Sequence, residues 1–275
     1  MSAPPPPIRP AVAAPAVLAA LMTAVLAAGL APDAARAQAP LPSGFLCCNL
    51  RVDRDWISDI NYRQDGSELI RAGTPVRGTE WGRYSVGLQM GSRVVWLGND
   101  YSRDLDDRRF SDRYIVRIDP RTRIAAAGFF VQDAIRQSRV MPGMTEAETA
   151  IALGYPVARY TPSLTAPVWK YWIDRTGEFS VRFDASRRVA AVTGDARVLG
   201  VVLYSLPPAT VRVAQQLLND YGYPVGDPDG RLGPATRQGL MDFQRDNGLT
   251  PNGMFDVDTL RRLGVEQVIV GAKSP

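Results

Sequence analysis

A pattern that occurs twice within residues 210–263 most restricts how this chain can fold. In each copy, an Asx-Gly pair is followed by an apolar residue and then by a Thr. The two sets are Asp229, Gly230, Leu232, Thr236 and Asn252, Gly253, Phe255, Thr259. Glycine tolerates the positive φ of a tight turn, and Asx side chains favour turns. We therefore expect two similar turns, each leading into a helix that is capped by Gly233 or Asp256.

The residues around both turns include apolar positions spaced as on one face of a helix. On the first predicted helix, one face carries residues three or four apart, which are Val211, Ala214, Gln215, Leu218 and Tyr221. Gly222 ends this helix, because Pro224 cannot continue it. A second helix ends at Gly248 and has an inner face made of Leu240, Phe243 and Gln244. The stretch thus predicts a compact three-helix unit with two similar loops.

This order of residues resembles the peptidoglycan-binding domain found at the ends of many bacterial cell-wall hydrolases. The residues that carry the resemblance are Val211, Gln215, Leu218, Gly222, Tyr223, Gly226, Asp229, Gly230, Gly233, Thr236, Phe243, Gln244, Gly248, Leu249, Gly253 and Thr259. One departure is Gly239, where the family usually has Ala; a glycine inside a helix costs roughly 1 kcal/mol. The resemblance implies non-catalytic binding to the peptide or glycan part of peptidoglycan.

Four residues of this unit are candidates for ligand contact: Tyr223, Asp229, Arg231 and Gln244. Tyr223 offers a flat face to a sugar or peptide, and Arg231 offers a guanidinium to a stem-peptide carboxylate. Asp229 suits an amine, and Gln244 suits amides. Each also has a structural alternative, because Asp229 can form the turn, Tyr223 can pack at the helix end and Gln244 can bridge backbone groups.

The absence of histidine limits the chemistry open to this protein. The chain of 275 residues contains no His, which excludes Ser-His triads, Cys-His pairs, His-ligated zinc and His acid–base catalysis. We expect no catalytic residue, no metal and no cofactor. A lytic transglycosylase needs only a carboxylate, so a hydrolase of that type is the alternative. The net charge of +4 is modest, and no dense basic run with interleaved aromatics indicates nucleic acid.

Residues 1–37 are predicted to be a secretory signal peptide. An unbroken run of small and apolar residues covers 16–30 and is short for a membrane span. Small residues follow this run, so cleavage is expected after Ala37 or Ala39. An uncleaved N-terminal anchor is the alternative. Cleavage would leave no transmembrane span and would place the protein in the periplasm, with outer-membrane association left open.

Two adjacent cysteines, Cys47 and Cys48, are the whole cysteine content. They allow a vicinal disulfide, pairing between two chains, or buried thiols. Lipidation of Cys47 is a fourth alternative, although Phe45 and Leu46 stand where a lipobox has small residues. A catalytic thiol is not expected, because no His is present to activate it.

Residues 38–135 are predicted to form a β-rich domain. Residues 85–88 and 93–97 are short β-prone runs, and residues 113–118 alternate polar and apolar side chains. We expect a small antiparallel barrel or sandwich of SH3-like type. Acidic residues gather within 99–109, but the interleaved arginines and a spacing unlike that of an EF-hand favour a solvated loop over a calcium site.

Residues 136–198 are predicted to form an α+β module. Thr145 and Glu148 make a capping box at a helix start, and alternating segments then indicate antiparallel strands. The module resembles the small BamE-like (SmpA/OmlA) outer-membrane lipoproteins. The matching segments are Gly143-Met144-Thr145, Leu153-Gly154, Pro156, Trp169-Lys170-Tyr171 and Val181-Arg182-Phe183. Because the lipidated Cys is missing and the module sits mid-chain, the resemblance implies a shared fold rather than a shared role.

The sequence as a whole predicts an α+β multidomain protein. Residues 206–208 are expected to link the middle module to the peptidoglycan-binding unit at 199–267, and an irregular tail is expected at 268–275. We expect a non-catalytic exported envelope protein that binds peptidoglycan and tethers or positions its N-terminal modules. An accessory subunit of an envelope assembly complex, which binds a partner protein through the middle module, is a further alternative.

Overall fold

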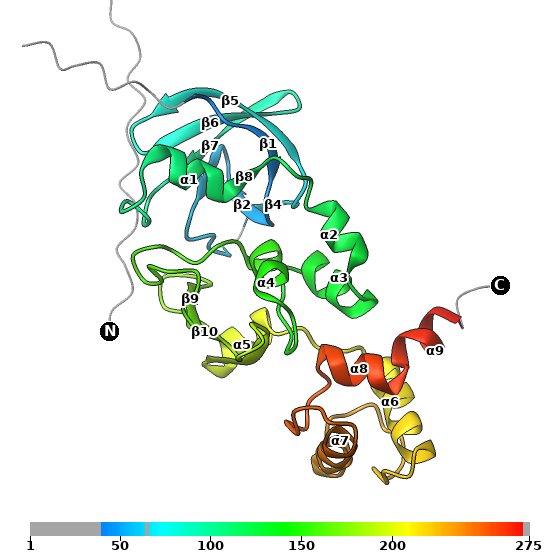
Figure 1. The fold of residues 1–275 in the computed structure, drawn as a ribbon. Coiled ribbons are helices and arrows are strands. Elements are labelled where there is room, and N and C mark those ends of the chain that lie inside the picture. Colours follow the sequence, from blue (N-terminus) through cyan, green and yellow to red (C-terminus); the bar gives the residue numbers. More distant parts are fainter. Residues whose placement is uncertain (1–39, 64–65, 272–275) are drawn as a thin grey trace, which may run out of the picture.

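The computed structural model describes residues 40–63 and 66–271, and Figure 1 shows three regions along this part of the chain. A curled sheet with helix α1 comes first, a module of helices and strands follows, and helices α6 to α9 come last. The α+β class expected from the sequence is confirmed. The predicted signal peptide and the last four residues of the predicted tail lie outside the described residues.

The N-terminal sheet is mixed and curls into a half-barrel. Its strands, in spatial order, are β4 (Glu68–Ile70), β2 (Leu50–Asp53), β3 (Trp56–Ser58), β7 (Arg93–Gly98), β6 (Ser85–Met90), β5 (Pro75–Gly82), β1 (Ser43–Leu46) and β8 (Ile115–Val116). Strand β3 pairs with β7 in parallel, whereas the other pairs are antiparallel. The sheet differs from the expected antiparallel barrel because, among the described residues, β4 and β8 each pair on one side only.

Helix α1 (Asp107–Tyr114) covers the start of a segment, residues 113–118, that was expected to be a strand. The side chain of Asp106 caps this helix and accepts a hydrogen bond of 2.8 Å from the backbone N–H of Arg109. Phe110 and Tyr114, one helical turn apart, are both buried in the core of the half-barrel. The strand is confirmed only at residues 115–116, which form β8. It failed at residues 113–114, because helical spacing and alternation are hard to distinguish over so short a run.

The middle module begins with three helices. Helices α2 (Arg121–Ala126) and α3 (Phe129–Arg136) lead to α4 (Glu146–Leu153). The predicted capping box at the start of α4 is confirmed: Glu148 N–H donates to the Thr145 hydroxyl at 3.2 Å, and Thr145 N–H donates to the Glu148 carboxylate at 2.7 Å. These reciprocal bonds satisfy backbone donors that would otherwise be unpaired at the helix start.

A small antiparallel sheet completes the module. Strands β9 (Val168–Trp172), β10 (Glu178–Phe183) and β11 (Val189–Gly194) lie in the order β11-β10-β9. Helix α5 (Ala196–Val202) then packs on β10 and β11 and buries Val198 completely. The predicted plan of a helix followed by antiparallel strands is therefore confirmed.

The three helices predicted for the C-terminal region are confirmed as α6 (Pro208–Asp220), α7 (Pro234–Asp246) and α8 (Val257–Leu263). A further helix, α9 (Val265–Gly271), occupies part of the stretch that was expected to be an irregular tail. Gly264 has a left-handed conformation, with φ 78°, that ends α8 and turns the chain into α9. The expectation of a tail failed because α9 packs against α6 and α8.

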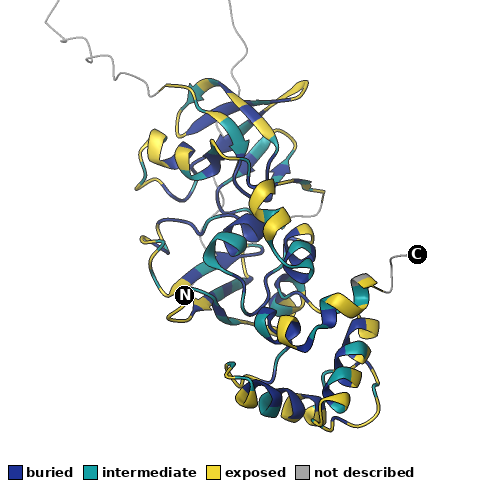
Figure 2. Cartoon of the chain, turned by 45° about the vertical axis from the view of Figure 1, so that its right-hand side comes forward, coloured by how far each residue is buried: buried dark blue, intermediate teal, exposed yellow. Residues whose placement is uncertain are grey.

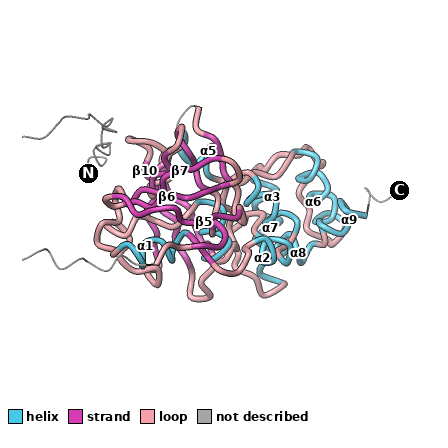
Figure 3. Tube along the Cα trace, turned by 90° about the horizontal axis from the view of Figure 1, so that it is seen from above, coloured by secondary structure: helices cyan, strands magenta, loops and turns pink. Residues whose placement is uncertain are grey.

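The C-terminal helices and the middle module share one continuous apolar core. Figure 2 shows buried residues along the inner sides of these helices, and Figure 3 shows α3 on the side of the module that meets them. Residues 206–208, expected to be a linker, are part of this packing, because Leu206 is half-buried against the core and Pro208 begins α6. The module boundaries expected at 135/136 and 198/199 fall within α3 and α5 and stay predictions.

In the described part of the chain, two hydrogen bonds join the C-terminal helices to the middle module. The backbone N–H of Val257 donates to the carbonyl of Pro142 at 3.1 Å, and the N–H of Phe129 donates to the Glu266 carboxylate at 3.0 Å. Glu266 therefore caps α3, whose own N-cap residue is a glycine. Gly143 lies tightly against Val257, since a Cβ at position 143 would be 2.9 Å from the Val257 Cβ.

Candidate functional site

A buried glutamine holds the first of the two predicted turns. Gln215 of α6 has its Nε2 within hydrogen-bonding distance of three oxygens: Asp229 Oδ1 (2.8 Å), Arg231 O (3.1 Å) and Thr236 Oγ1 (3.0 Å). Its Oε1 accepts from the N–H of Gly230 at 2.8 Å. Gln215 is 1% exposed, so these bonds form away from water. We call Gln215, Asp229, Gly230 and Thr236 the first lock.

A second glutamine repeats the arrangement in the next turn. Gln244 of α7 has its Nε2 close to three oxygens: Asn252 Oδ1 (2.9 Å), Met254 O (3.0 Å) and Thr259 Oγ1 (2.9 Å). Its Oε1 accepts from the N–H of Gly253 at 2.9 Å, and the residue is fully buried. We call Gln244, Asn252, Gly253 and Thr259 the second lock. The repeated sequence pattern therefore corresponds to a repeated hydrogen-bond network.

Both locks require glycine at the turn. Gly230 and Gly253 have φ values of 79° and 64°, which favour glycine. A Cβ at Gly230 would lie 2.7 Å from the carbonyl oxygen of Pro208, and one at Gly253 would lie 3.1 Å from that of Arg237. Any larger residue would therefore have to displace the backbone of the adjoining helix.

Asp229 and Arg231, two of the predicted contact residues, lie together on the solvent side of the first lock. Both residues are exposed, and Asp229 Oδ1 also accepts from the backbone N–H of Arg231 at 2.8 Å. The hydrogen bond from Gln215, followed by this backbone bond, lowers the pKa of Asp229 below its usual value. Within the described part of the chain, the Arg231 guanidinium makes no ion pair. The two side chains therefore present one anionic and one cationic group to solvent.

Tyr223 lies elsewhere in the domain. Its hydroxyl donates to Asp246 at 3.1 Å, and its ring meets the ring of Phe243 edge-on, with centroids 5.4 Å apart. Partial burial, and then the hydrogen bond to Asp246, raises the pKa of Tyr223. Tyr223 follows the C-terminal end of α6, whereas the first lock lies beside Pro208 at its start. The structure thus brings Asp229 and Arg231 together but does not bring Tyr223 to them.

Gln244, the fourth predicted contact residue, is placed inside the second lock. Its buried amide bridges backbone and side-chain groups, which is the structural alternative foreseen for it. Direct contact with a ligand stays a prediction. From its spacing, Gln215 was expected only to line one face of a helix. The signal was present, because each copy has a Gln before the Asx-Gly pair and a Thr after it.

The structure explains the unusual Gly239. A Cβ at this position would lie 2.4 Å from the Cγ1 of Val225, which is buried against α7. The glycine therefore weakens the helix but makes room for a branched core side chain. The departure from the family pattern is a packing feature of this chain.

Other predicted features lie outside the C-terminal domain. Cys47 and Cys48 are bonded to each other, with both residues buried at the wall of the half-barrel. Within residues 40–63 and 66–271, no group of three or more His, Cys, Asp or Glu is placed to hold a metal ion. None of the helices in those residues combines the length and the apolar character that a membrane span needs.

Comparison with known proteins identifies the C-terminal domain. Residues 208–263 match the family described as "Putative peptidoglycan binding domain". The chain is also similar to the localization factor PodJL of two Caulobacter vibrioides strains, with 39% identity over 85 residues. That similarity covers 30% of this chain and 9% of PodJL, so the chain corresponds to a small fraction of that relative. No solved structure matches the chain.

Proposed function

We propose that this protein is a non-catalytic component of the bacterial cell envelope. It binds peptidoglycan through residues 208–263 and positions its half-barrel and middle module at the wall. The observation that carries this proposal is the family match, supported by two intact locks that give the matched residues a rigid surface. A peptidoglycan-binding domain implies a location in the cell envelope.

The first lock is the best candidate for ligand contact. Its Asp229 and the neighbouring Arg231 face solvent, whereas the second lock continues into Val257, which bonds to the middle module. Arg231 suits a stem-peptide carboxylate, and Asp229 suits an amine of the same peptide. We therefore place the ligand's charged groups at the first lock. Tyr223 would contact a separate part of a long polymer, because it lies at the other end of α6.

The non-catalytic role rests on the composition of the chain. Without any His, the usual zinc, cysteine and serine mechanisms of wall hydrolases have no base or ligand. The lytic transglycosylase alternative would need a carboxylate in a helical domain of substantial size, whereas residues 43–98 are mainly strands.

The localisation we propose is periplasmic, after removal of the signal peptide at residues 1–37. Mass spectrometry of the protein from cells should find an N-terminus near Gln38 or Pro40. A diacylated Cys47 would instead place the protein on a membrane as a lipoprotein. An intact Met1 in the envelope fraction would support the uncleaved anchor.

Sedimentation with purified peptidoglycan sacculi tests the proposed binding. The full chain should pellet with the sacculi, and R231A should reduce the bound fraction several-fold. The matched control is R237A, which removes an exposed arginine of α7 whose Cβ lies beside Gly253 of the second lock. Equal losses in both variants would indicate non-specific charge attraction, and no pelleting of the wild type would refute the proposal.

The same preparations test the absence of catalysis. Incubation with sacculi should release no soluble muropeptides at any pH from 4 to 8. Sustained release would show that the chain is a hydrolase. In that case, replacing the exposed carboxylates one at a time would identify the acid.

A further inference from the structure

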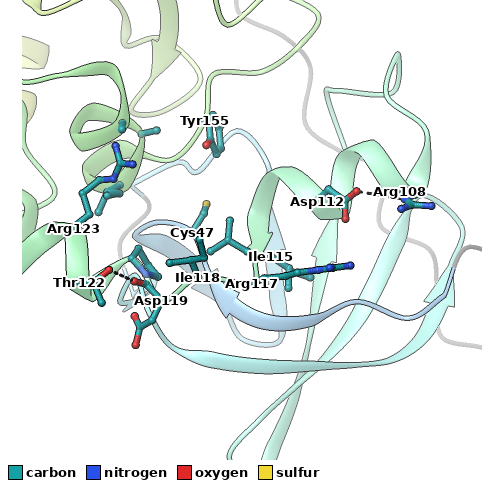
Figure 4. A pocket seen from close by; sticks show the side chains of 15 residues that line it. Cys47, Arg108, Asp112, Ile115, Arg117, Ile118, Asp119, Thr122, Arg123 and Tyr155 are labelled. Atoms are coloured by element: carbon teal, nitrogen blue, oxygen red, sulfur yellow. Dashed lines mark hydrogen bonds and ion pairs between the residues drawn. The ribbon is translucent and has the colours of Figure 1, made fainter.

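A groove that the proposed function does not use lies beside the edge strand β8. Two cavities, of about 850 and 480 Å³, share four lining residues, which are Arg108, Asp112, Ile115 and Arg117. The larger cavity is bounded by residues of β8, α1, α2 and α4 (Figure 4). The smaller one continues past α1 to residues 40–44. We call the two cavities together the β8 groove.

The groove carries unbalanced positive charge. Its two carboxylates are each paired with an arginine: Asp112 with Arg108 (3.6 Å) and Asp119 with Arg121 (2.5 Å). Arg117 and Arg123 also line the groove, are exposed, and make no ion pair within residues 40–63 and 66–271. Two guanidiniums therefore remain available to an anionic ligand.

Between these guanidiniums the groove exposes one large apolar side chain, that of Ile118. Ile118 is 78% exposed, an extreme value for a large hydrophobic side chain in this structure. Figure 4 shows Ile118, Ile115 and Cys47 in the middle, with Arg123 on one side and Arg117 on the other. Exposed apolar surface rimmed by charge is typical of an interaction site.

The backbone of β8 also offers unused hydrogen-bonding groups. Val116 is paired with Phe45 of β1, so the neighbouring residues on either side direct their backbone groups away from β1. The N–H of Ile115 is used, because it donates to Ser111 O. Within the described residues, the carbonyl of Ile115 and the N–H of Arg117 make no hydrogen bond. An extended chain could pair with both groups.

We propose that the β8 groove binds an extended segment of a partner protein that has apolar residues flanked by acidic ones. The segment adds a short strand to β8 through the free backbone groups. Its apolar centre covers Ile118, and its carboxylates meet Arg117 and Arg123. An extended peptide is favoured over a compact anion because the charged groups stand apart, with apolar surface and a free strand edge between them.

Fluorescence anisotropy of the full chain with a labelled peptide tests this proposal. The probe is acetyl-Asp-Glu-Ile-Val-Ile-Glu-Asp-amide, whose seven residues span about 23 Å when extended. A small interface of this kind should give a Kd of roughly 10 to 100 μM. The double variant R117E/R123E should weaken binding at least tenfold, and I118D should also weaken it. The control R83E reverses an exposed charge on the β5–β6 turn and should change Kd less than twofold.

Peptide variants and hydrogen exchange complete the test. A peptide with Pro at the central Val should bind poorly, because Pro cannot complete the strand pairing. The peptide should also protect the Arg117 amide from exchange. The proposal is overturned if R83E weakens binding as much as the double variant, or if oligoglutamate binds as tightly as the probe. It is also overturned if Arg117 and Arg123 instead mediate binding to phosphatidylglycerol vesicles or self-association of the chain.

Discussion

The two locks of the C-terminal domain have the same internal geometry but different surroundings. In each, a buried glutamine amide bonds to an Asx side chain, a glycine N–H, a carbonyl and a Thr hydroxyl, at distances between 2.8 and 3.1 Å. The first lock faces solvent and has a charged Asp229, and its helix is capped by Gly233, which has no side chain. The second has a neutral Asn252 and is capped by Asp256.

The second lock is additionally tied to the rest of the molecule. The Asp256 carboxylate accepts from Thr259 N–H and from the Asn252 side chain, both at 2.8 Å. The next residue, Val257, bonds to Pro142 of the middle module. The same hydrogen-bond network therefore has two uses in this domain. One copy anchors the domain, and the other leaves its charged groups accessible to a ligand.

The largest effect is expected from removing either glutamine. Q215L and Q244L each leave buried donors and acceptors unpaired, which should lower the free energy of unfolding of the domain by about 3 kcal/mol. Q244L should cost more, because the second lock also supports docking. Denaturant unfolding of the full chain measures both. Q216L, which removes an exposed glutamine on the same helix, is the control and should cost little. Equal costs for Q215L and Q244L would contradict the anchoring role.

A smaller loss of stability should follow from a substitution that separates the C-terminal domain from the middle module. G143A places a methyl group against Val257, and its left-handed backbone, with φ 87°, is also strained by alanine. G226A has a similar φ of 77° but nothing within 4 Å of the added carbon. The strain alone should cost about 1 kcal/mol in each variant, so the excess in G143A reports docking. Limited proteolysis near residue 206 should accelerate in G143A alone.

The capping contact across the same interface should contribute less. E266A removes the carboxylate that accepts from the N–H of Phe129, and loss of such a cap costs about 1 kcal/mol. E266Q keeps an acceptor and should cost a few tenths. Exchange of the Phe129 amide, measured by NMR, reports the contact directly. Unchanged protection in E266A would show that the cap does not form in solution.

The smallest expected effect is a dependence of stability on pH that the first lock shows and the second lock does not. The folded-state pKa of Asp229 lies below its usual value of 3.8, so its stabilising contribution is fully present above that pH. The contribution is lost as pH falls through the folded-state pKa. Amide exchange of Gly230, corrected for its intrinsic rate, should therefore lose protection on acidification. D229N, which copies the neutral residue of the second lock, should remove that dependence on pH. Persistence of the dependence in D229N would assign it to another carboxylate.

The sequence was most informative where structure is determined locally. The turn glycines, the helix ends at Gly222 and Gly248, and the capping box at Thr145 all depend on residues within a few positions of one another. Tyr221 is an exception, since helical spacing placed it on the inner face, yet it is 55% exposed. It lies at the helix end, where the periodicity no longer determines burial.

The parts that were not predicted depend on contacts between distant residues. The parallel pairing of β3 with β7 joins Ile57 to Leu97, and no local pattern specifies it. The docking bond between Val257 and Pro142 connects two regions that the sequence suggested were separated by a linker. Within the candidate site, Asp229 and Arg231 were identified together because they are sequence neighbours. The role of Gln215 depends on a contact fourteen residues away in the chain.

The shared core of the middle module and the C-terminal helices has a mechanical consequence. If the last domain binds the wall, the half-barrel is held at a fixed distance from the wall and in a fixed orientation, as it would not be on a flexible linker. The distance between the wall and the β8 groove is then set by the folded structure and not by the length of a linker. The rate of encounter with a partner segment would then depend on the mobility of that segment, because the orientation of the groove is fixed.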